Sequence, residues 1–97
     1  MAIVRWTDEA LLDLDNIASY IAKDSPQDAK RIVHQIALKV KKIKRFPRMG
    51  RIIPEKQNPL LRELIYNDYR IVYEINDNNK IITILRIKHR KDIYKKR

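Results

Sequence analysis

The first half of the chain places apolar residues with the period of an α-helix. They recur every three or four positions over residues 8–22 and again over residues 26–45, so each segment has one apolar face. Thr7 suits the N-cap of the first helix, and Ser25 followed by Pro26 marks the start of the second. Because only a short link separates the two segments, the pattern predicts an antiparallel helical hairpin.

The second half changes to the two-residue period of β-strands. Residues 60–66, 69–75 and 80–88 are rich in β-branched and aromatic side chains, and polar turns separate them. A shorter β-prone segment, residues 2–6, precedes the first helix. Residues 47–59 hold three of the four prolines and the only glycine, so we expect a turn-rich connector there.

This order of elements predicts an α+β fold, in which the helical hairpin packs on one face of an antiparallel β-sheet. The 97 residues are expected to form one domain, 1–97. Alternation places one set of side chains of the middle strand on the same face: Tyr69, Ile71, Tyr73 and Ile75. If that set faces the helices, Arg70 lies on the face that the helices leave open.

Composition narrows the class of protein. Apolar residues make up 44% of the chain, but none of the apolar runs is long enough to span a bilayer. Cysteine is absent, which excludes disulfides and thiolate zinc sites, and His34 and His89 lack ligand spacing. The N-terminus does not read as a signal peptide. We therefore expect a cytoplasmic protein with no metal, no other cofactor and no membrane partner.

The net charge of +10 is concentrated in two segments. Residues 29–56 carry +9 and residues 86–97 carry +6, whereas residues 1–28 carry −4 and residues 57–85 carry −1. Positive segments of this kind attract polyanions. For residues 29–45 the alternative is a solvated helix face that keeps the protein soluble.

Several strings of residues, in their order and spacing, resemble the RelE/ParE superfamily of bacterial toxins. They are YIAKDSP over 20–26, FPRMGRIIPE over 46–55, RELIYNDYRIVYEI over 62–75 and ITILRIKHRKDIY over 82–94. The resemblance covers nearly the whole chain and implies the RelE-like microbial ribonuclease fold. It also implies the toxin of a type II toxin–antitoxin module.

Two activities occur on this fold, so the resemblance leaves the mechanism open. RelE-like members cut messenger RNA in the ribosomal decoding site, whereas ParE-like members inhibit DNA gyrase by binding. The implied partners are a cognate antitoxin, acidic and partly disordered when free, and either the ribosome with mRNA or DNA gyrase.

Cleavage of RNA by the ribose 2′-hydroxyl needs a base, positive charge near the phosphate and a proton donor. By resemblance, Arg70 matches the sheet arginine of the family and would hold the phosphate, with Arg90 adding charge. His89 could exchange a proton near neutral pH, and Tyr94 could stack on a base or act as an acid. Each has a structural alternative; Arg70, for example, could pair with Glu74.

Further basic side chains are candidates for contact with nucleic acid: Arg62, Arg86, Lys88 and Lys91. One departure from the RelE-like pattern concerns the strand before Arg70, where those nucleases carry lysines and this chain has Glu63. Alternation places Arg62 on the opposite face from Glu63, so Arg62 is no obvious substitute.

Different strings resemble different branches of the superfamily. The REL and GR-x-x-PE strings resemble the ParE branch, whereas HRKDIY at the end resembles RelE. The primary hypothesis is a ribosome-dependent endoribonuclease that uses Arg70, His89, Arg90 and Tyr94. The alternatives are a gyrase inhibitor without nuclease activity and, third, a plain RNA- or DNA-binding module.

Overall fold

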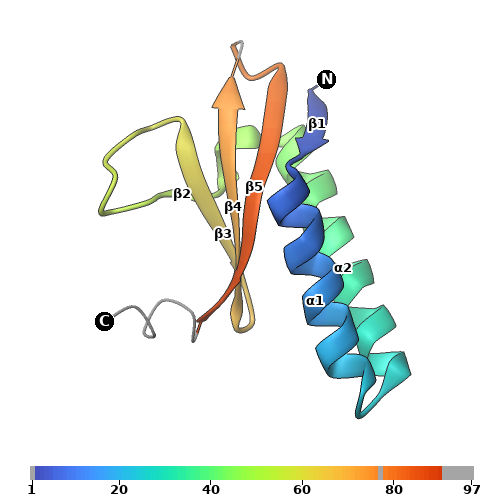
Figure 1. Cartoon of the computed structure of the whole chain (residues 1–97). Helices are drawn as coiled ribbons and strands as arrows, with labels where there is room; N and C mark the ends of the chain where they lie inside the picture. The colour runs from blue at the N-terminus through green and yellow to red at the C-terminus, as the bar shows by residue number, and fades with distance from the viewer. Residues whose placement is uncertain (1, 77, 91–97) are drawn as a thin grey trace.

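The computed structural model describes residues 2–76 and 78–90. Two helices lie side by side against one face of a five-stranded sheet (Figure 1). The elements in chain order are β1 (Ile3–Trp6), α1 (Asp8–Ala22), α2 (Pro26–Arg45), the 3-10 helix η1 (Pro47–Met49), β2 (Arg51–Ile52), β3 (Leu61–Tyr66), β4 (Tyr69–Asn76) and β5 (Ile81–His89). None of the helices in the described part of the chain is long and apolar enough to cross a membrane.

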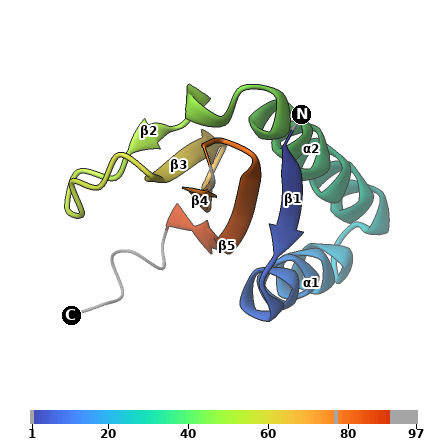
Figure 2. The same ribbon diagram turned by 90° about the horizontal axis from the view of Figure 1, so that it is seen from above.

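The sheet has the strand order β1-β5-β4-β3-β2. Strands β3, β4 and β5 form the expected antiparallel meander, but β1 pairs parallel to β5, so the sheet is mixed. The helical hairpin follows β1, and the segment with η1 then leads to β2 at the opposite edge of the sheet, as the view from above shows (Figure 2). The connector contains a strand that the sequence did not predict, β2, which pairs with Glu63 and Arg62 of β3.

Both helices begin at the predicted residues because their N-caps are local features of the sequence. The Thr7 hydroxyl accepts a hydrogen bond from the Ala10 backbone N–H at 3.0 Å, and the Ser25 hydroxyl accepts one from Asp28 at 3.1 Å. These bonds satisfy amides that have no partner within the helix. The sequence therefore located the helical hairpin correctly.

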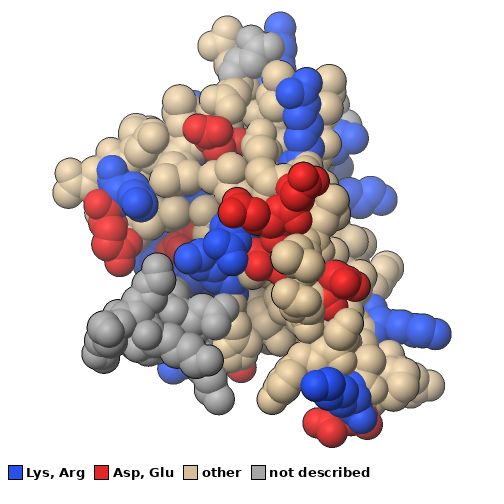
Figure 3. Space-filling model, viewed as in Figure 1, with Lys and Arg blue, Asp and Glu red and all other residues tan. Residues whose placement is uncertain are grey.

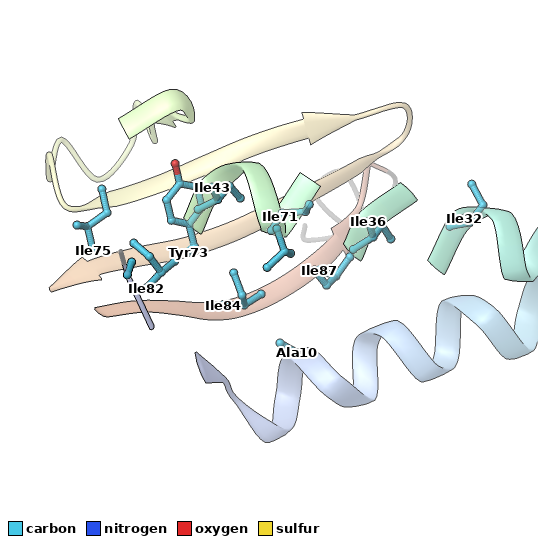
Figure 4. Close-up of a cluster of buried hydrophobic side chains, with 12 residues drawn as sticks. Ala10, Ile32, Ile36, Ile43, Ile71, Tyr73, Ile75, Ile82, Ile84 and Ile87 are labelled. Atoms are coloured by element: carbon cyan, nitrogen blue, oxygen red, sulfur yellow. The ribbon is translucent and has the colours of Figure 1, made fainter. Parts of the chain in front are cut away.

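The hydrophobic core lies between the helices and the sheet (Figure 4). Helix α2 contributes one stripe of buried residues to this core: Ile32, Ile36, Val40 and Ile43. The opposing layer includes alternate residues of β4, namely Ile71, Tyr73 and Ile75, each fully buried. This confirms the predicted face of β4 and leaves Arg70 on the face that the helices do not cover.

Tyr73 fixes the segment that leads from α2 to β2. Its buried hydroxyl donates to the Pro47 carbonyl at 2.6 Å and accepts from the Gly50 N–H at 2.9 Å. Burial raises the pKa of the Tyr73 phenol, although the bond from Gly50 acts in the other direction. A Cβ at Gly50 would lie 2.6 Å from the Tyr73 hydroxyl, so this close approach requires glycine.

Candidate functional site

The open face of the sheet carries a buried carboxylate between two arginines. Glu63 of β3 is 6% exposed, and its Oε2 accepts a hydrogen bond from Arg70 Nη1 of β4 at 2.9 Å. The same oxygen accepts from Arg51 Nε of β2 at 2.7 Å, with Arg51 Nη2 at 2.6 Å. One carboxylate thus joins three neighbouring strands.

The partner of Arg70 differs from both sequence-based expectations for that residue. Glu74, the structural alternative, instead accepts a hydrogen bond from the Asn76 amide at 3.2 Å. The guanidinium of Arg70, whose side chain is 22% exposed, is bonded to Glu63. Part of the positive charge expected to hold a phosphate is therefore balanced inside the protein.

Two further cations project from β5 on the same face. The register pairs Lys88 with Arg70 and Arg86 with Val72. Arg86 Nε and Nη2 donate to the carboxylate of Asp13 on α1 at 2.7 and 3.1 Å. The Asp13 carboxylate also accepts from the Ile87 backbone N–H at 2.9 Å, so α1 fixes this end of β5.

His89 lies on the other face of the sheet. Its register partner is Tyr69, and the two rings meet edge to face with centroids 5.1 Å apart. Tyr69 packs against the hydrophobic core, on the side that the helices cover. Burial raises the pKa of the Tyr69 phenol, and the nearby Asp68 adds to the rise. The structure therefore does not bring His89 and Arg70 together on one face.

Arg90 meets the β3–β4 turn. Its backbone N–H donates to the Asp68 carbonyl at 2.6 Å, and the two side chains form an exposed ion pair at 3.7 Å. A hollow of about 320 Å³ at this turn is lined by Arg70, Arg90, Asp68, Tyr69, Asn67 and Ile65. Two of the predicted catalytic residues, Arg70 and Arg90, therefore share one hollow.

The three remaining predicted site residues do not lie on the open face among the described residues. Lys91 and Tyr94 lie outside the described residues. Arg62 projects away from Arg70, and its guanidinium donates to the carbonyls of Pro59, Arg48 and Gly50 at 2.8, 3.1 and 3.0 Å. Arg62 therefore holds residues of the connector in place, and its side chain does not contribute to the open face of the sheet.

The sequence missed two residues that organise this face, Asp13 and Arg51. Asp13 is an acidic residue beside the apolar stripe of α1, which signals partial burial but does not name a partner. Arg51 lies in the connector, where no strand was expected. Among residues 2–76 and 78–90, no group of three histidine, cysteine, aspartate or glutamate side chains could hold a metal ion.

Comparison with known proteins places the chain in a family. The sequence model described as "ParE toxin of type II toxin-antitoxin system, parDE" matches residues 4–94, so the chain belongs to this family of the RelE/ParE toxin superfamily. The candidate toxin Y4kP of Sinorhizobium fredii is 38% identical over 84 residues, which is 84% of each chain.

Solved structures agree with this assignment. A chain of the chromosomal ParDE system from P. aeruginosa superimposes with a TM-score of 0.74 and 28% identity, over 92% of this chain and 96% of that one. A chain of the E. coli RelBE complex gives a TM-score of 0.67 at 14% identity, over the same shares. The RelBE2 complex from M. tuberculosis gives 0.60 at 24%, over 92% and 98%. The two RelBE likenesses show the fold alone.

Proposed function

We propose that this chain is the toxin of a ParDE-type module and arrests growth by binding DNA gyrase, without cutting mRNA. The carrying observation is the buried Glu63 carboxylate bonded to both Arg70 and Arg51. RelE-like nucleases carry lysine on this strand, where a cation would stabilise the charge that develops on the phosphate. Glu63 supplies a negative charge there instead.

The distribution of the other candidate groups supports the same proposal. General acid–base catalysis requires donor and acceptor groups within hydrogen-bond reach of the reacting atoms. His89, the candidate proton carrier, packs against Tyr69 on the helix-covered face, whereas Arg70 lies on the open face. A role for Tyr94 remains a prediction from the resemblance.

The family assignment points the same way. The chain belongs to the ParE toxin family, and its likeness to a chain of the ParDE system from P. aeruginosa extends to 28% sequence identity. By the resemblance, ParE-like members act on gyrase by binding. No bond then has to be broken, and the Arg51–Glu63–Arg70 cluster serves to hold β2, β3 and β4 in place.

A cognate antitoxin is part of this proposal, since the family model describes the toxin of a type II toxin–antitoxin system and the similar P. aeruginosa chain comes from a ParDE system. The net charge of +10 favours an antitoxin segment that is acidic. The open face of the sheet and the basic segment after β5 are the surfaces that such a segment would cover. If that segment folds on binding, the cost of ordering it reduces the affinity.

A ribosome-dependent endoribonuclease is the second candidate function. It is favoured by the hollow that Arg70 and Arg90 share, and by the HRKDIY string that begins at His89. It requires Arg70 to release Glu63 when a phosphate binds.

Induced expression in a bacterial host separates the two functions. The proposal predicts filamentation, the SOS response and trapped gyrase–DNA complexes before protein synthesis stops. Rapid arrest of translation with mRNA cut in the ribosomal A site would establish the nuclease and rule out the proposal. A strain that also expresses the antitoxin is the control, and it should grow normally.

A further inference from the structure

The end of α2 and the segment after it carry exposed cations around an exposed aromatic ring. We name this group the α2-end patch; its members are Lys41, Lys42, Lys44, Arg45, Phe46 and Arg48. All are exposed except Lys44, which is half-buried. The end of α2 rises past the start of α1 in Figure 1, and Figure 3 shows several separate basic side chains along the upper right of the molecule.

Acidic residues are absent from the stretch of sequence that carries the patch. The sequence has no acidic residue between Asp28 and Glu55. In the part of the chain that the structure describes, none of the ion pairs includes a cation of the patch. Like charges three and four residues apart, such as Lys41 with Lys44 and Arg45, repel each other on a helix. The negative end of the helix dipole offsets this repulsion only for cations in the last turn of the helix. An anionic ligand would relieve the repulsion.

Phe46 supplies a flat surface within these cations. Its side chain is 58% exposed, and the Arg45 guanidinium lies over the ring at 5.6 Å from the centroid. The backbone N–H of Phe46 ends α2 by donating to the Lys42 carbonyl at 2.7 Å, which does not involve the ring. The core does not use this ring either. Proteins that bind single-stranded nucleic acids stack the bases on exposed aromatic rings and hold the phosphates with nearby cations.

Two hollows flank the patch and share Lys44 and Arg45. One, of about 440 Å³, lies along α2 over Leu38 and the lysine side chains. The other, of about 470 Å³, lies where Lys44 and Arg45 meet Lys80 and the asparagines of the β4–β5 turn, Asn78 and Asn79. The asparagine amides can both donate to and accept from base edges. Lys80 adds a further cation.

We infer that the α2-end patch binds single-stranded nucleic acid, with phosphates held by the cations and a base stacked on Phe46. The β3–β4 turn with Arg70 and Arg90 lies at the opposite end of the sheet (Figure 1), so this is a second surface. The inference does not rest on gyrase binding. A duplex would offer the phosphates without free base faces, and an acidic protein segment would offer carboxylates without bases.

Fluorescence anisotropy with a labelled oligothymidylate and the purified full chain tests the stacking step. Phe46→Leu should weaken binding by about 5- to 150-fold, the loss expected for one stacked base. Tyr20→Leu is the matched control, because Tyr20 is 74% exposed on α1, and its affinity should stay within about twofold of wild type. Thermal melts followed by circular dichroism check that both variants are folded.

The charge step is tested by the salt dependence of the same binding. The Lys41→Gln/Arg45→Gln variant should reduce the slope of log affinity against log salt by about 1.4, since each lost phosphate contact to a single strand removes about 0.7. Lys23→Gln/Lys30→Gln removes the same charge from exposed positions elsewhere and should keep the wild-type slope.

Four outcomes would overturn the inference. The first is an equal loss of affinity in Phe46→Leu and Tyr20→Leu, and the second is an equal change of salt slope in Lys41→Gln/Arg45→Gln and Lys23→Gln/Lys30→Gln. The third is tighter binding of duplex DNA than of oligothymidylate. The fourth is that polyglutamate displaces the labelled oligothymidylate as well as unlabelled oligothymidylate does at matched charge. The last would assign the patch to an acidic protein segment.

Discussion

Glu63 and Arg70, seven residues apart on adjacent strands, are joined by a hydrogen bond of 2.9 Å on the open face of the sheet. Arg70 was the expected phosphate-binding residue, and Glu63 was the acid in place of an expected lysine. The structure connects these two observations, because Glu63 is the hydrogen-bond partner of Arg70. The bond makes Arg70 part of the framework that links β3 and β4.

We expect Glu63→Gln to lower the free energy of unfolding by about 1 to 3 kcal/mol, because a neutral amide cannot balance two guanidinium groups. The cost stays below the value for a fully buried pair, since Arg51 is 53% exposed. Urea denaturation measures the change. Glu74→Gln is the matched control on the same face and should change stability by less than about 0.5 kcal/mol. Equal effects of both substitutions would show that the cluster is not structural.

Asp13→Ala should lower the free energy of unfolding by about 1.5 to 3 kcal/mol, because Arg86 and the Ile87 N–H lose their acceptor. Amide hydrogen exchange gives the sharper measurement, since the Ile87 amide should lose protection first. Asp15→Ala, exposed on the same helix, should leave that amide protected. Unchanged protection of Ile87 in Asp13→Ala would show that α1 does not fix the end of β5.

Tyr73 makes stability depend on pH at the alkaline end. Burial raises its pKa, so the folded chain keeps this proton to a higher pH than the unfolded chain does. The contribution is complete below about pH 10 and is lost as the pH rises through the folded pKa. Between about pH 9 and pH 11, Tyr73→Phe should therefore lose less stability than the wild type, as measured by urea denaturation at each pH.

Tyr73→Phe also removes the partner of the Pro47 carbonyl and the Gly50 N–H, which costs about 1 to 3 kcal/mol at neutral pH. Tyr20→Phe is the control, because the Tyr20 side chain is 74% exposed. An alkaline slope for Tyr73→Phe as steep as that of wild type would contradict the assignment.

Arg70→Lys should keep its toxicity if the chain acts by binding gyrase, because lysine still pairs with Glu63. We expect the substitution to lower the free energy of unfolding by about 1 kcal/mol. This lowers the folded-to-unfolded ratio about fivefold, which leaves nearly all of a stable toxin folded. The measurement is the inducer dose that halves growth. An RNA-cutting enzyme would lose most of its activity, because lysine cannot bind a phosphate with two parallel hydrogen bonds. Complete loss of killing with a folded Arg70→Lys protein would therefore favour the nuclease.

Local signals in the sequence predicted most of the fold. Thr7 and Ser25 set the helix starts through their own side chains, and alternation along β4 placed Tyr73 inside and Arg70 outside. The parallel pairing of β1 with β5 was not predictable in this way, because it joins Ile3 to Ile81 through a long crossover.

The candidate site was harder to predict because it depends on neighbours from different strands. Alternation assigns a face to Glu63 but says nothing about which side chain of the adjacent strands it meets. Its partner Arg51 lies in a two-residue strand, too short to leave a periodic pattern. The sequence offered His89 and Arg70 as candidate catalytic residues without placing one relative to the other, and the register that pairs His89 with Tyr69 puts His89 on the other face of the sheet.

The most direct test of the proposed function uses the purified full chain in two reactions in parallel, DNA supercoiling by purified gyrase and cell-free translation with primer extension on the mRNA. The proposal predicts that the chain inhibits supercoiling and traps cleaved DNA on gyrase, while the mRNA stays intact, and that adding the antitoxin restores supercoiling. Cleavage of the mRNA in the ribosomal A site, with supercoiling unaffected at the same toxin concentration, would contradict it.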